Sequence, residues 1–89
     1  MTSASLPSKL ILSKGEYKTC RIKVKDAQET FPAIALSQQF YSFFRVAKDR
    51  DKALNMLSKL FDNGHRAVIT QTPKAYAIWV LETEAMPLG

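Results

Sequence analysis

Two stretches near the start of the chain have the hydrophobic pattern of strands. From residue 17 to 25, polar and apolar positions alternate as in a strand with one buried face. One side would carry Lys18, Cys20, Ile22 and Val24, and the other Thr19, Arg21, Lys23 and Lys25. The polar DAQE at 26–29 predicts a turn, and TFPAIAL at 30–36 predicts a second strand with Pro32 at its start or at an edge. A shorter apolar run, KLIL at 9–12, is followed by a turn at Gly15 and suggests that a hairpin begins there.

The segment QQFYSFFRVAKDRD at 38–51 has aromatic residues at one end and charged residues at the other. Its aromatic and β-branched content favours a strand over 40–47. As a strand it would place Phe40, Ser42, Phe44 and Val46 on one face, and Tyr41, Phe43, Arg45 and Ala47 on the other. The alternative is a helix capped by Ser37, with aromatic residues lined up at helical spacing.

The second half of the chain predicts a helix followed by a hairpin. Asp49 can cap the helix, Asp51 suits the positive end of its dipole, and Gly64 suits the left-handed position past its end. The apolar stripe of this helix is Ala53, Leu57, Leu60 and Phe61 together with Leu54. Segments 65–72 and 74–82 then predict two strands, and Pro73 favours a connecting loop of more than two residues.

These elements predict a single α+β domain with the order ββββαββ. We expect a mostly antiparallel sheet of five to six strands with one main helix packed on one face. The Ser-rich residues 1–8 and the segment 83–89, which contains Pro87, are expected to be flexible tails around a folded domain at 9–82.

One short helix can cover only one face of such a sheet. The segments 40–47 and 74–82 nevertheless have large apolar side chains on both faces. Exposed rings on the uncovered face would form a patch typical of an interaction site. The alternative is that the N-terminal segment or the C-terminal tail folds over this face and buries it.

The charge of the chain favours an acidic partner. Lys and Arg number 13 against 8 Asp and Glu, so the formal charge is +5. Between residues 1 and 25 there are six basic residues and the single acid Glu16.

Catalytic and metal chemistry find little support in the residue types present. Cys20 is the one cysteine and His65 the one histidine, so no disulfide or Cys and His metal cluster can form within the chain. Cys20 alternates with core residues and is interpreted as a packed thiol, and Asp49 and Asp51 as a capping pair. The three glycines lie far apart, so no phosphate loop is predicted. We therefore expect no enzyme, no cofactor, no small-molecule substrate and no membrane partner, and a cytoplasmic location.

The function that the pattern favours is a small protein-interaction module, an accessory or regulatory subunit. It would dock a protein partner, or a second copy of itself, through the face that the helix leaves open. The expected anchors are Tyr41, Phe43, Arg45 and Trp79, and Arg21, Lys23 and Lys25 would favour an acidic partner. The alternative is single-stranded RNA binding, with bases stacked on the same aromatic residues and phosphates held by the same cations.

Overall fold

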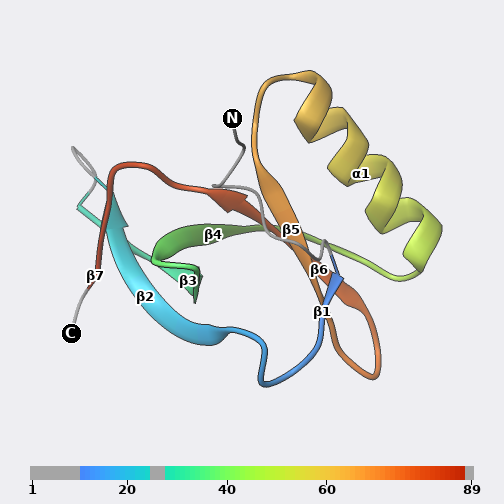
Figure 1. Cartoon of the computed structure of the whole chain (residues 1–89), viewed down its shortest axis with the longest axis horizontal. Coiled ribbons are helices and arrows are strands. Elements are labelled where there is room, and N and C mark those ends of the chain that lie inside the picture. Colours follow the sequence, from blue (N-terminus) through green and yellow to red (C-terminus); the bar gives the residue numbers. More distant parts are fainter. Residues whose placement is uncertain (1–10, 25–27, 88–89) are drawn as a thin grey trace.

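The computed structural model describes residues 11–24 and 28–87, which form one helix on one seven-stranded sheet (Figure 1). The elements are β1 (Ile11–Leu12), β2 (Lys18–Val24), β3 (Thr30–Leu36), β4 (Gln39–Ala47), α1 (Arg50–Asp62), β5 (Ala67–Gln71), β6 (Tyr76–Leu81) and β7 (Ala85–Pro87). The strands lie in the order β1-β5-β6-β4-β3-β2-β7, and every neighbouring pair except β1 and β5 is antiparallel. The predicted α+β class and the order ββββαββ are confirmed, and β7 is an additional strand.

The first strand does not form the predicted hairpin with β2. It pairs in parallel with β5, with Ile11 opposite Ile69, so β1 and β2 lie far apart in the sheet. Gly15 does make the expected turn, with φ +97°. A turn signal specifies a local bend and not the strand that pairs afterwards. Here the edge of β5, whose residues 67 to 70 are all buried, takes β1 as its neighbour.

The C-terminal segment extends the opposite edge. Residues 85–87 pair with β2, with Met86 opposite Lys23, where the sequence predicted a flexible tail. The unpaired backbone of β2 offers a template for this addition, which needs no hydrophobic pattern of its own. The predicted tail at 1–8 lies outside the described residues.

The segment at 39–47 is a strand and not the alternative helix. A two-residue turn, Ser37 and Gln38, joins it to β3, and both residues have positive φ, +52° and +65°. This is the backbone hand that matches the twist of paired strands, and it normally favours Gly or Asn. Neither residue type occurs in SQQ, so the sequence indicated a break here without indicating a tight hairpin.

The helix begins and ends as the sequence predicts. The Asp49 side chain accepts a hydrogen bond from the Lys52 N–H at 2.9 Å. At the other end Gly64 has φ +85°, and the His65 N–H reaches back to the Leu60 carbonyl at 2.9 Å. Since β4 and β5 are both antiparallel to β6, α1 connects two parallel strands with β6 between them.

The sheet has buried residues on both of its faces. On the helix side, defined as the face that α1 covers, Ala53 and Leu57 pack with Ile69 and Ile78. On the far side, Leu12, Ile34, Tyr41 and Val68 form a second cluster, and Tyr17 from the β1–β2 connection packs against it. The N-terminal segment therefore closes part of the far side, which is the alternative to a partner-covered face. No helix in the described part of the chain is long and apolar enough to cross a membrane.

The packing of α1 on the sheet can be tested with a single substitution in the core. Leu57 is 2% exposed, and Leu57→Ala should lower the free energy of unfolding by roughly 2 to 5 kcal/mol because it leaves a cavity under the helix. Urea denaturation followed by circular dichroism measures this loss. Asn55→Ala, at an exposed position of the same helix, is the matched control and should change stability by less than about 0.5 kcal/mol. Equal losses would contradict the assigned packing.

Candidate docking surface on strand β4

Strand β4 has a neighbour on both sides for only part of its length. Its ladder with β3 runs from Leu36 and Gln39 to Ala33 and Ser42, whereas its ladder with β6 continues to Ala47. From Phe43 to Ala47 the backbone therefore pairs, among the residues that the structure describes, on the β6 side alone. Figure 1 shows β4 running on toward the helix while β3 stays beside β2. A row of unpaired N–H and C=O groups of this kind is a template for another strand.

Two local features separate β3 from β4 at this point. Pro32 comes directly before Ala33, where the β3 ladder with β4 ends, and it has no N–H to donate. In β4 the register against β6 shifts between Phe43 and Arg45, so that Phe44 is an extra residue. A bulge of this kind bends a strand and increases its twist. The bend carries the second half of β4 away from β3.

The bulge also changes which side chains share a face. Phe43 pairs with Trp79 on the far side, but Arg45 pairs with Ile78 on the helix side. The prediction that Arg45 lies beside Tyr41 and Phe43 is therefore wrong. Val46 takes its place on the far side, while Ala47 is buried under the helix. The simple alternation of a strand fails here because one residue is inserted into it.

The half-paired stretch exposes several large side chains. Phe43, Phe44 and Val46 are 43%, 45% and 51% exposed. Simple alternation would put Phe44 opposite Ile78, and because the bulge gives that position to Arg45, Phe44 lies at the surface. The Arg45 guanidinium carbon lies 5.3 Å from the centroid of the Phe44 ring, within the range of a cation–π contact. Three apolar side chains and one cation thus surround an open strand edge.

Beside this stretch a hollow of about 300 Å³ separates β4 from the C-terminal half of α1. Its lining residues are Phe44, Arg45, Met56, Lys59, Leu60 and Asn63. The apolar side chains can receive an apolar side chain of a partner. Arg45 and Lys59 are the two charged lining residues and favour a carboxylate nearby.

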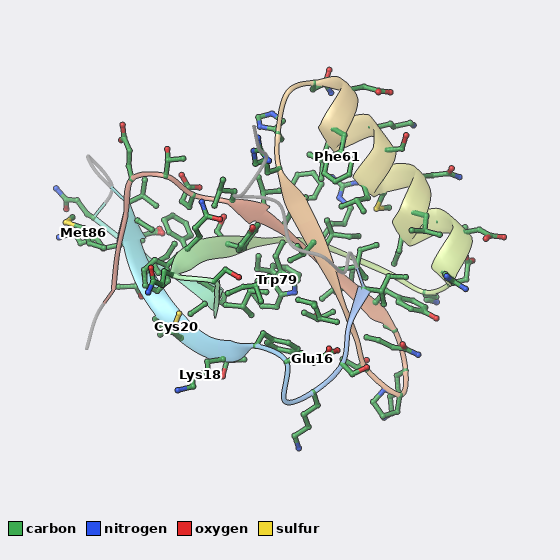
Figure 2. The ribbon with its side chains drawn as sticks, in the orientation of Figure 1. Glu16, Lys18, Cys20, Phe61, Trp79 and Met86 are labelled. Carbon is green, nitrogen blue, oxygen red and sulfur yellow. The ribbon has the colours of Figure 1, made fainter. Side chains whose placement is uncertain are left out.

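The remaining predicted anchors are less accessible. Tyr41 is 1% exposed and belongs to the far-side core, where burial raises the pKa of its hydroxyl against the opposing effect of the Arg66 charge. Trp79 is half-buried in the middle of the sheet (Figure 2). Its indole N–H donates to the Thr70 hydroxyl at 2.9 Å, and its ring meets Phe43 edge to face at 5.5 Å. Trp79 therefore packs against Phe43 and holds the position of its ring.

Two of the predicted basic residues, Arg21 and Lys23, lie on the far side together with Phe43. Thr19 pairs with Ile34 and Ile34 with Tyr41, so the residues two positions on, Arg21 and Phe43, share that face. Arg21 donates two hydrogen bonds to the Thr30 hydroxyl, at 3.1 and 3.0 Å, which holds its guanidinium against β3. Lys23 is exposed, and Lys25 lies outside the described residues.

No catalytic arrangement is apparent among the described residues. Cys20 is half-buried in β2, and His65 is exposed before β5, which β6, β4 and β3 separate from β2 in the sheet. In the described ranges, no three His, Cys, Asp or Glu side chains gather as metal ligands would. Every buried side-chain N or O atom described has a hydrogen-bond partner.

The partial burial of Cys20 predicts low reactivity. Desolvation raises the pKa of its thiol, so less thiolate is present at a given pH than in the unfolded chain. We expect alkylation by iodoacetamide to reach half its maximal rate at a higher pH in the folded protein than in urea. Mass spectrometry of the modified cysteine over a pH series measures both profiles. A lower midpoint in the folded protein would contradict the assignment of Cys20 as a packed thiol.

The hydrogen bond that positions Trp79 predicts a measurable coupling. Thr70→Val keeps the shape of a 2% exposed side chain but removes the acceptor for the indole N–H, which should cost about 1 to 3 kcal/mol of unfolding free energy. In a Trp79→Phe background the same change should cost much less, because no indole N–H is then left without a partner. Chemical denaturation of the four proteins gives the coupling. An equal cost in both backgrounds would show that the hydrogen bond does not contribute.

Comparison with protein-family models, with curated protein sequences and with solved structures finds no match to this chain.

Proposed function

We propose that this domain is a non-enzymatic protein-interaction module that binds an extended segment of a partner protein along β4. The observation that carries the proposal is the half-paired stretch from Phe43 to Ala47, which combines an open backbone edge with exposed apolar side chains. Strand addition of this kind draws affinity from main-chain hydrogen bonds and specificity from alternate side chains. A surface of this kind is sufficient for an accessory or regulatory subunit, whose task is to bind a partner protein.

The surroundings of β4 support an acidic and partly apolar partner. Arg45 and Lys59 line the hollow on the helix side, and Arg21 and Lys23 lie on the far side. A bound strand would send alternate side chains to these two sides. An apolar side chain suits the hollow beside Phe44, and Asp or Glu side chains suit the cations.

The same charges argue against a second copy of the chain as the occupant. Two copies paired through β4 would bring Arg45 of one close to the cations of the other, and each copy has a formal charge of +5. Like charges facing one another across an interface oppose association. The positive charge of the surface attracts an acidic segment of another protein, whereas it repels a second, equally basic copy of this chain.

RNA binding on the same surface is the alternative function, supported by the shared face of Arg21, Lys23 and Phe43. It has weaker support, because bases need exposed ring faces to stack on. Tyr41 is buried and Trp79 is half-buried beneath Phe43. Phe43 and Phe44 are the two β4 rings left for stacking, and they lie on opposite sides of the sheet, Phe43 beside Trp79 and Phe44 in the hollow on the helix side.

Peptides selected on the purified protein from a displayed library of random 12-residue sequences test the proposal. We expect the enriched peptides to alternate apolar residues with Asp and Glu. Binding should protect the amides of 43–47 from hydrogen exchange, and Phe43→Ala should weaken it at least tenfold in fluorescence anisotropy. The same substitution should cost only about 0.5 to 1.5 kcal/mol of stability, because what it removes from the fold is mainly the edge contact with Trp79.

Phe61→Ala is the matched control, since Phe61 is 37% exposed on α1 and does not line the hollow beside β4. It should leave peptide affinity within about twofold. Unchanged affinity in Phe43→Ala, or protection confined to another strand, would reject the proposal.

A concentration-dependent dimer in sedimentation that Phe43→Ala abolishes would assign β4 to a second copy instead. Tighter binding of an eight-residue oligouridine than of any selected peptide, lost in Phe43→Ala, would favour RNA.

A further inference from the structure

A second and larger hollow, of about 630 Å³, opens between two loops that are distant in the sequence. The connection from β1 to β2 forms one wall and the loop from β5 to β6 forms the other. The lining residues are Lys14, Gly15, Tyr17, Lys18, Thr19, Gln71, Thr72 and Pro73. None of them belongs to the β4 surface, and the volume lies within the range of small-molecule sites.

Hydrogen bonds within each loop fix the conformation of that loop. In the first, the Glu16 N–H donates to the Ser13 carbonyl at 3.0 Å, and the Ser13 N–H donates to the Glu16 carboxylate at 2.7 Å. In the second, the Thr72 hydroxyl accepts hydrogen bonds from the Lys74 and Ala75 N–H groups at 3.3 and 3.0 Å. Each wall is therefore ordered before any ligand arrives, which lowers the entropic cost of binding.

The charged side chains that line this hollow are basic among the described residues. They are Lys14 and Lys18, and both are exposed. Glu16 lies between them in the sequence and keeps its negative charge while its carboxylate accepts the Ser13 N–H, so the connection has one positive charge in excess. Figure 2 shows Lys18 at the start of β2 with its side chain directed away from the sheet. Two ammonium groups on one connection favour an anion such as a phosphate.

The rest of the lining suits a flat ring with polar edges. Tyr17 is half-buried against the far-side core, which fixes its ring, and Pro73 lies on the opposite wall. Gly15 adds no side chain to this lining, and nothing lies within 4 Å of the position that its Cβ would occupy. Thr19 and Gln71 supply a hydroxyl and an amide that can hydrogen-bond to a base.

From this arrangement we infer that the hollow binds a nucleoside phosphate, with the phosphate at Lys14 and Lys18 and the base between Tyr17 and Pro73. The ligand is a free nucleotide or one unit of a single strand, because both present the same phosphate and ring. Base stacking on an aromatic side chain and phosphate neutralisation by Lys are the two contributions expected in either case. This site is independent of the proposed docking at β4.

Titrations of the ¹⁵N-labelled protein followed by NMR test the inference with four probes: uridine 5′-monophosphate, adenosine 5′-monophosphate, inorganic phosphate and an eight-residue oligouridine. The nucleotides should shift the amide signals of residues 14–19 and 71–72 and leave those of 43–47 unchanged. A mononucleotide that binds as tightly as the oligonucleotide indicates a free ligand, and a tenfold preference for the oligonucleotide indicates a single strand. Inorganic phosphate binding as tightly as the nucleotides, or no shifts with any probe, would overturn the inference.

The double variant K14A/K18A should weaken nucleotide binding at least tenfold. Its matched control is K48A/K52A, which removes the same charge at exposed positions near the start of α1 and should change affinity by less than about twofold at 0.15 M salt. Tyr17→Leu should also weaken binding, with folding checked by circular dichroism because Tyr17 packs on the core. Equal losses in the two lysine pairs would mean that net charge, and not this hollow, binds the ligand.

Discussion

The sheet has apolar side chains on both faces, but a single helix can cover only one of them. Much of the structure follows from this constraint. The helix has 13 residues and is thus about 20 Å long, and its main contacts with the sheet are with β4, β5 and β6. The other face of the sheet cannot be left to water, because Ile34, Tyr41 and Val68 lie there. The chain closes it with its N-terminal segment, where Leu12 and Tyr17 pack on that face. The connection that carries Tyr17 also forms one wall of the larger hollow.

The bulge in β4 is the second feature with wide consequences. Without it, Phe44 would occupy the place that Arg45 takes opposite Ile78. With it, Ala47 reaches the core under the helix, and Phe43, Phe44 and Val46 remain exposed around an edge that β3 no longer pairs. Bulges often protect edges from unwanted pairing, yet here the bulge accompanies exposed aromatic side chains. That combination suits a surface that selects one kind of strand.

Local signals in the sequence were sufficient for most of the elements. Alternation over 17–25, the segment TFPAIAL at 30–36 after a polar turn, and the aromatic content of 40–47 predicted strands that the structure confirms. The helix was predicted with its cap at Asp49 and its end at Gly64, and the loop after β5 is longer than two residues, because Gln71 pairs with Tyr76. Caps and turns depend on residues that are adjacent in the chain, which is why a single sequence reveals them.

The sequence by itself thus determined the α+β class, the identity of the helix and of the six predicted strands, and the basic character of the surface. Only the tertiary structure decided that β1 pairs with β5, that residues 85–87 extend the sheet, and that Tyr41 is core while Phe44 is exposed. The physical reason is the range of the interactions. Propensity and periodicity act over a few residues, whereas strand partners, bulges and the hollow between two distant loops depend on segments that meet only after the chain has folded.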